Sequence, residues 1–193
     1  MTAYDYLPLH MGAAIGADVQ VVKALLEAFP DGASETGQDG HLPLHSTIGN
    51  KAGLDVVAAL LQAYRHTSEV VDLYLHLPLH GAVKNKAGLN VVIVLLQAYK
   101  NAAAKVNCHK ELPLHLVAFN RTDMLVVNTR IELFPEGAST PGQNEYLLLH
   151  LSAAIRCDVQ IVKALLKAFK SRMGKYASTD RRLAVAIGHC NQS

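Results

Sequence analysis

The sequence has 193 residues, enough for one compact domain or one continuous array of repeats. Half of the residues are hydrophobic and 18% are charged, which excludes an intrinsically disordered chain. A net charge of +2 is too small to indicate nucleic-acid binding by itself, and the absence of Trp argues against a platform for stacking bases. The longest apolar runs are six residues, from Val56 and from Val91, whereas a membrane-spanning helix needs roughly 20.

The first element in the chain is a tetrapeptide that recurs. Leu-Pro-Leu-His begins at residues 7, 42, 77 and 112, and Leu-Leu-Leu-His begins at 147, so five copies follow one another at a constant step of 35 residues. A constant step of this size is the sequence signature of a repeat architecture.

Each copy predicts two helices. The first begins at the proline, which suits the first turn of a helix, and runs for about nine residues. The second begins near a residue that can cap a helix, at Asp18, Gly53, Gly88, Asp123 and Asp158. It carries a β-branched pair and then, in four of the five copies, a leucine pair (the fourth has Arg130-Ile131), a spacing that predicts a helix with one apolar face.

The second helix of each copy is expected to end at an aromatic residue. These residues are Phe29, Tyr64, Tyr99, Phe134 and Phe169, and a proline or a basic residue follows each of them. The dozen or so residues before the next Leu-Pro-Leu-His are expected to form a finger-like loop.

One copy is too small to fold alone. Ordering 35 residues costs on the order of 50 kcal/mol, more than a single helix pair recovers by burial. We therefore expect an all-α repeat solenoid that forms a single domain over residues 1–193, with five repeats of 35 residues plus a C-terminal half repeat at 182–193. The apolar residues Leu183, Val185 and Ile187 in that half repeat predict either a fragment of a longer array or self-association through this end.

These motifs resemble the ankyrin repeat, whose unit contains D-G-x-T-P-L-H-x-A followed by V-V-x-x-L-L. The best local match is residues 38–45, QDGHLPLH, and the resemblance extends from residue 4 to about residue 180. Two departures stand out. Leucine replaces the threonine before the proline in every repeat, so burial of that leucine must offset a lost helix cap. Leu75, Lys110 and Glu145 replace the loop glycine, which predicts irregular loops there. The tetratricopeptide repeat is the alternative fold, but it lacks a Pro-Leu-His opening.

Ten histidines suggest metal binding or catalysis. One histidine per repeat, at His10, His45, His80, His115 and His150, predicts side chains about 10 Å apart in a stack, whereas metal ligands must converge on one ion. We expect these histidines to bond loop backbone at the helix starts. No phosphate-binding loop, nucleophile elbow or zinc-protease motif occurs, so the sequence predicts no enzyme activity, no cofactor and no small-molecule substrate.

The resemblance implies that the loops and the exposed positions of the first helices line a concave groove for a protein partner. The candidate partner-binding residues are Asp39, His41, Asn50, Tyr74, His76, Lys84, Asn85, His109, Lys110, Leu116, Phe119, Asn120, Asn144 and Tyr146. Phe119 is either an exposed anchor beside Leu116 or a residue buried between the fourth and fifth repeats. Lys51, Lys86 and Arg121 add positive charge, which favours an acidic or mixed partner surface.

Two other functions remain open. The chain could be a targeting or regulatory segment of a longer protein, or a weakly basic nucleic-acid binder that uses Lys51, Lys84, Lys86 and Arg121. Three cysteines without C-x-x-C spacing, and no visible secretory signal or membrane span, predict a cytoplasmic or nuclear protein.

Overall fold

The structure is a computed structural model that describes residues 7–113, 115–116, 140, 159–160, 162–163 and 165–167. The chain divides into two compact units, 1–108 and 109–193. Every regular element in the described residues is helical, which confirms the all-α prediction for that part of the chain.

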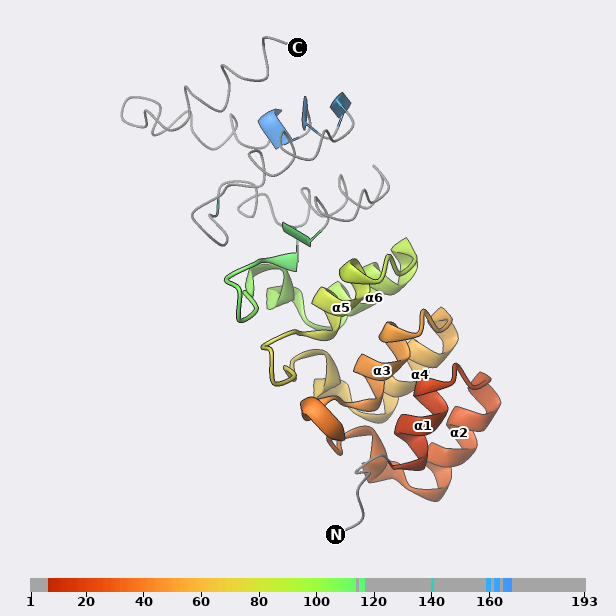
Figure 1. The fold of residues 1–193 in the computed structure, drawn as a ribbon. Helices are drawn as coiled ribbons and strands as arrows, with labels where there is room; N and C mark the ends of the chain where they lie inside the picture. The colour runs from red at the N-terminus through yellow and green to blue at the C-terminus, as the bar shows by residue number, and fades with distance from the viewer. Residues whose placement is uncertain are drawn as a thin grey trace. The chain divides into compact units, whose positions relative to one another are not determined.

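The first unit consists of helix pairs that recur every 35 residues. The first helices pack on one another, α1 on α3 and α3 on α5, and the second helices do the same, α2 on α4 and α4 on α6, so the helices form two rows (Figure 1). The bounds are α1 (Pro8–Ala14), α2 (Val19–Ala28), α3 (Pro43–Gly49), α4 (Leu54–Ala63), α5 (Pro78–Lys84) and α6 (Leu89–Ala98). The predicted starts at the prolines and after Asp18, Gly53 and Gly88 are confirmed.

The helices of the first row have seven residues, not the nine that the sequence predicts, because a left-handed residue ends each of them. Gly16, Lys51 and Lys86 have φ values of 68°, 56° and 57°. In the third pair the N–H of Lys86 bonds the carbonyl of Val83, and the N–H of Ala87 bonds that of Ala82. These two bonds are the Schellman arrangement, which satisfies carbonyls at a helix end.

The helices of the second row end at Ala28, Ala63 and Ala98, one residue before the predicted aromatic stops. A short 3₁₀ turn follows each of them: η1 (Pro30–Ala33), η3 (Arg65–Ser68) and η4 (Lys100–Ala104). Their β-branched positions supply the core, since Val22, Val57 and Val92 are fully buried.

The leucine before the proline is buried as expected in three of the four copies, whereas Leu7 is only partly buried. Leu42, Leu77 and Leu112 are at most 1% exposed, and none of the first-row helices has a side-chain cap at its first residue. Burying a leucine is worth about 1.5–3 kcal/mol, comparable with or larger than the lost cap.

In the second unit the described residues 159–160, 162–163 and 165–167 are helical, as the fifth repeat predicts, and Leu165 is buried. The predicted site residues Phe119, Asn120, Asn144 and Tyr146, and the partial repeat at 182–193, lie outside the described residues. Within the part of the chain that the structure describes, no helix is long and apolar enough to cross a membrane.

Candidate functional site

The loops before α3 and α5 share the same backbone hydrogen bonds. We call residues 35–41 finger two and residues 70–76 finger three. The N–H of Gly37 donates to the carbonyl of His41 at 2.8 Å, and the N–H of Asp72 donates to that of His76 at 3.0 Å. A tight turn lies inside each loop, closed by Gly40 N–H to Gly37 O at 3.3 Å and by Leu75 N–H to Asp72 O at 3.0 Å.

The expectation of irregular loops where glycine is missing is wrong for finger three. Gly40 and Leu75 have φ values of 71° and 57°, so leucine adopts the left-handed conformation that glycine takes one repeat earlier. Lys110, which occupies the same position one repeat after Leu75, has φ 58°. The bonds around the turn therefore fix the backbone against the local preference of the side chain.

Successive loops are joined through their backbones. The N–H of Leu73 donates to the carbonyl of Asp39 at 2.9 Å, and one repeat later the N–H of Cys108 donates to that of Tyr74 at 3.0 Å. The tip of finger three is therefore hydrogen-bonded on both sides.

In three of the four Leu-Pro-Leu-His copies the histidine bonds the start of its own helix. Its Nδ1 accepts the backbone N–H of the leucine three residues earlier, at 3.2 Å for His45, 3.1 Å for His80 and 3.0 Å for His115. A side chain at the third helical position thus satisfies the N–H that precedes the helix, as the glutamate of a capping box does.

The same histidines reach the next repeat. Since Nδ1 of His45 accepts, its Nε2 carries the proton and donates to the carbonyl of His76 at 3.3 Å. Nε2 of His10 lies 3.0 Å from the carbonyl of His41. The predicted structural role is confirmed for His10, His45, His80 and His115, and His150 lies outside the described residues.

Burial favours the neutral imidazole in three of these histidines. It lowers the pKa of His10 and His115, and together with the neighbouring His41 it lowers the pKa of His45 to about 4. A neutral imidazole has one donor and one acceptor, which is what a bridge between two backbone groups requires.

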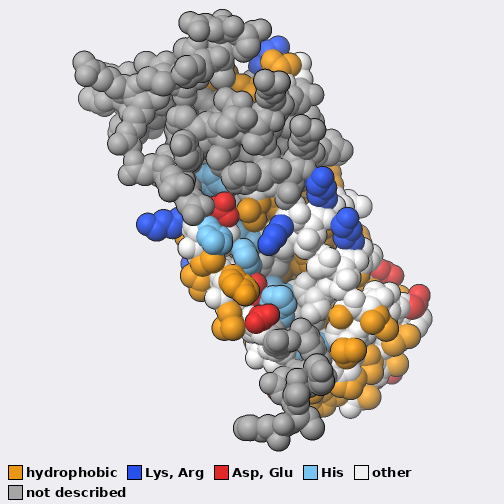
Figure 2. Space-filling view, in the orientation of Figure 1, with side chains coloured by type: hydrophobic (Ala, Val, Ile, Leu, Met, Phe, Trp, Pro, Cys, Tyr) orange, Lys and Arg blue, Asp and Glu red, His pale blue; other side chains and the backbone are white. Residues whose placement is uncertain are grey.

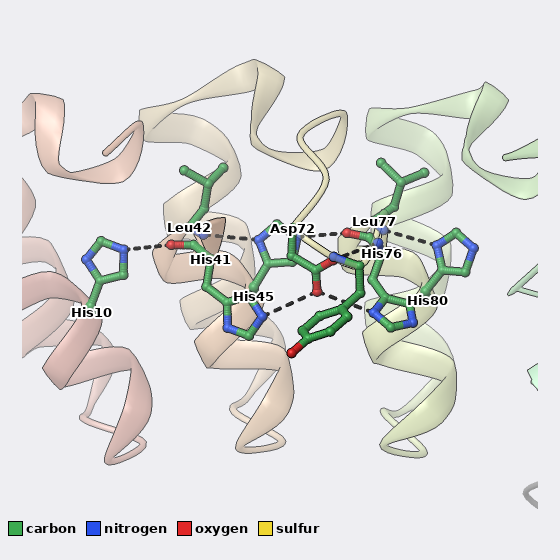
Figure 3. Close-up of polar contacts among 9 residues, drawn as sticks. His10, His41, Leu42, His45, Asp72, His76, Leu77 and His80 are labelled. Carbon is green, nitrogen blue, oxygen red and sulfur yellow. Dashed lines mark hydrogen bonds and ion pairs between the residues drawn. The ribbon is translucent and has the colours of Figure 1, made fainter. Parts of the chain in front are cut away.

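Asp72 lies at the centre of a polar cluster between the two fingers (Figure 3). Its side chain is only 5% exposed. Oδ1 accepts the backbone N–H groups of Tyr74 and His76, each at 2.8 Å. Oδ2 lies 3.3 Å from Nε2 of His41 and 3.3 Å from Nδ1 of His76.

The surroundings of Asp72 favour the carboxylate. Burial alone would raise its pKa, but the hydrogen bonds from the backbone N–H groups of His76 and Tyr74, with the neighbouring His76 and His45, hold the pKa below its usual value. Sequence reasoning missed Asp72. An aspartate in a loop often accepts the backbone N–H of the residue two positions later, which is an Asx turn, and this tendency could have indicated Asp72.

The histidine rings of the two fingers lie against those of the helices. His41 stacks on His45 with ring centres 5.5 Å apart, and His76 lies 5.8 Å from His80. Among the described residues, no group of three or more His, Cys, Asp or Glu side chains is arranged to hold a metal ion.

Finger three exposes large apolar side chains beside this cluster. Leu73 is 72% exposed, Tyr74 52%, Leu75 49% and Val71 40%, and Val106 in the next loop is 43% exposed. Hydrophobic side chains and a row of histidines gather on this side of the molecule (Figure 2). The sequence predicted only Tyr74, because isolated apolar residues in a loop give no periodic signal.

Of the other predicted residues, Asp39 and Lys84 are exposed, and Asn50 and Asn85 follow the last residues of α3 and α5. In the second unit, His109 and Lys110 are exposed. The prediction that Leu116 binds a partner is corrected, because its side chain is only 9% exposed and is not presented to a partner. In the third repeat the position after Leu-Pro-Leu-His faces the previous repeat, since a Cβ on Gly81 would lie 3.4 Å from Ile48.

A separate open groove lies in the second helix row, between α4 and α6. It has a volume of about 530 Å³ and is lined by Ala58, Leu61, Gln62, Arg65, Val94, Gln97 and Ala98. None of the predicted partner-binding residues lines it.

No family model matches the chain, and no curated protein sequence matches it significantly. The resemblance to the ankyrin repeat therefore rests on the sequence motifs alone.

Proposed function

We propose that this chain is a non-catalytic protein-interaction scaffold, built as an ankyrin-like array of five repeats that binds a partner protein through its fingers and first-row helices. The observation that carries the proposal is finger three. Four large apolar side chains stand exposed on a loop that a buried carboxylate and backbone bonds hold in place.

Exposed apolar side chains on a rigid loop support binding for two reasons. Contiguous apolar surface is costly in water and is typical of interaction sites. A loop that is already ordered loses little conformational entropy when a partner binds, so more of the contact energy appears as affinity.

The charge of the first helix row supports a partner that is acidic or mixed. Residues 43–52 and 78–87 contain Lys51, Lys84 and Lys86 and no Asp or Glu. A surface of one sign selects partners of the opposite sign and speeds their association. The exposed free thiol of Cys108 suits the reducing cytoplasm or nucleus, which we propose as the location.

A blocking substitution tests the proposal. A Cβ on Gly49 would meet nothing within 4 Å, so Gly49→Trp adds bulk on the first-row side without a clash. Ala24→Trp adds the same bulk at an exposed position of α2, in the second row. Ligands would be selected from a displayed library of random peptides against the full chain.

We expect Gly49→Trp to lower the affinity for the selected peptides by tenfold or more, with Ala24→Trp close to wild type and the circular dichroism of both unchanged. Equal affinity of the two variants, or loss in Ala24→Trp alone, contradicts the proposed surface.

A further inference from the structure

We propose that finger three and the lysines at the ends of α3 and α5 form one peptide-binding surface. Its occupant is an extended protein segment that carries a bulky apolar residue and, about four to six residues away, a pair of acidic residues. The inference rests on the proposed function and specifies the chemistry of the partner.

The apolar end of the surface is the tip of finger three. Leu73 is the most exposed of its side chains, and its N–H is bonded to Asp39 of finger two. On the other side, Tyr74 accepts from Cys108 through its carbonyl and donates its N–H to the carboxylate of Asp72. The tip therefore presents its apolar side chains from a fixed backbone.

Leu75 combines two unfavourable features. It is left-handed, with φ 57°, where glycine occupies the same place in finger two, and its side chain is 49% exposed. Neither feature helps the chain to fold. Strain and exposed apolar surface that coincide at one residue point to a role in binding.

The charged end of the surface lies at the opposite end of the helices. Lys51 and Lys86 follow α3 and α5, and both are exposed and left-handed. Among the described residues, neither ammonium group has an ion-pair partner. Lys and Arg side chains lie on the same face as the row of histidines (Figure 2). Cations without an internal partner are available to acidic groups of a ligand.

The length of α5 sets the spacing in the ligand. Its seven residues span about 10 Å at 1.5 Å per residue. An extended chain advances by about 3.3–3.6 Å per residue, so about three residues cross the helix and one to three more reach the finger tip. At the charged end, the open space over Gly49, the last residue of α3, lets a peptide backbone approach the helix closely.

The test uses an array of synthetic peptides and the labelled full chain. Each peptide contains one Leu or Trp and one Glu-Glu pair, separated by one to ten Ser or Gly residues, in both orders. A matched set carries Gln-Gln in place of Glu-Glu.

Two variants probe the two ends without adding backbone strain, because asparagine tolerates the left-handed conformation. Leu73→Asn with Leu75→Asn removes the apolar end, and Lys51→Asn with Lys86→Asn removes the charged end. Val21→Asn is the control, since Val21 is 49% exposed on α2 in the second row.

We expect the strongest binding at separations of four to six residues and at least tenfold weaker binding of the Gln-Gln peptides. The leucine variant should lose tenfold or more in affinity for the peptides. The lysine variant should lose as much, but only for the Glu-Glu peptides, and Val21→Asn should bind like wild type. Binding that ignores spacing or charge, or no binding of any peptide, overturns the inference.

The outcome separates this inference from the proposed function. One result is that Gly49→Trp blocks peptides that the leucine and lysine variants still bind normally. That result would support the proposed interaction surface and contradict the stated ligand chemistry. Ligands that Gly49→Trp does not block would remove both.

Discussion

Nε2 of His41 lies 3.3 Å from Oδ2 of Asp72, so a buried carboxylate of finger three is shared with a histidine of finger two. The same oxygen lies 3.3 Å from Nδ1 of His76. This contact adds a side-chain link between two loops whose backbones are already bonded through Leu73 and Asp39.

Replacing Asp72 tests the strength of that link. Asp72→Ala leaves two backbone N–H groups and two histidines without their acceptor, so we expect a loss of about 2–4 kcal/mol in the free energy of unfolding. Asp72→Asn should cost only about 1 kcal/mol, because the amide oxygen can still accept the N–H groups of Tyr74 and His76.

Asn107, which stands one repeat after Asp72 and is 2% exposed, indicates that asparagine fits this place in the loop. Urea denaturation measures the effect, with Glu27→Ala on the exposed side of α2 as the control. Equal losses for Asp72→Ala and Glu27→Ala would contradict the role given to this carboxylate.

The buried histidines make stability depend on pH. The pKa of His45 falls from 6.5 in the unfolded chain to about 4 in the folded one, so the unfolded state takes up more protons as the pH drops between these values. The free energy of unfolding is therefore highest above pH 6.5 and decreases down to about pH 4, by up to about 3 kcal/mol for this residue.

The lowered pKa values of His10 and His115 add to the same decrease. Asp72 still contributes to the free energy of unfolding over this pH range. A carboxyl whose pKa is lowered in the folded state loses that contribution only as the pH falls below its usual pKa of 3.8. Urea midpoints at pH 7 and pH 5 test this, and His45→Gln should flatten the slope. A slope that is the same in wild type and His45→Gln would argue against a neutral, buried His45.

His80 tests the capping role of the repeated histidine. Its Nδ1 accepts the N–H of Leu77 and its side chain is fully buried, so His80→Ala leaves a cavity and a buried donor without its acceptor. We expect a loss of about 2–4 kcal/mol. His66→Ala, at an exposed histidine that pairs with Glu69 and touches the ring of Tyr64, should cost less than about 0.5 kcal/mol.

Thermal unfolding of both histidine variants provides the comparison. If His80→Ala unfolds at the temperature of His66→Ala, the hydrogen bond to Leu77 contributes little and the repeated histidine needs another explanation.

The left-handed lysines predict stabilising substitutions. Lys51→Gly and Lys86→Gly remove a conformational cost and should each raise the free energy of unfolding by about 0.5–1 kcal/mol. Gly16→Ala should lower it by about 1 kcal/mol, and purely through the backbone, since a Cβ there meets nothing within 4 Å.

Lys105→Gly is the control, because Lys105 has φ −86° and gains nothing from glycine. We expect it to be neutral or slightly destabilising in a thermal melt. An increase as large as that of Lys86→Gly would show that loss of positive charge, and not backbone strain, produces the effect.

The helix starts of the first unit could be predicted from the sequence because their signals are local. A proline begins α3 and α5, and a β-branched pair marks the buried face of α4 and α6. The length of α5 could not be predicted, because Lys86 adopts the left-handed conformation through bonds to carbonyls inside the helix and against its own preference. Leu75 escaped prediction for the same reason.

The candidate site depended on contacts between repeats. The sequence alone determined the 35-residue step, the helix starts and the histidine that caps α3 and α5, since these follow from side-chain chemistry within a few residues. Only the tertiary structure decided that Asp72 lies against His41 and that Leu73 and Leu75 remain exposed. Which side chains meet or stay in water is set by how closely one repeat stacks on the next, a distance that no residue specifies by itself.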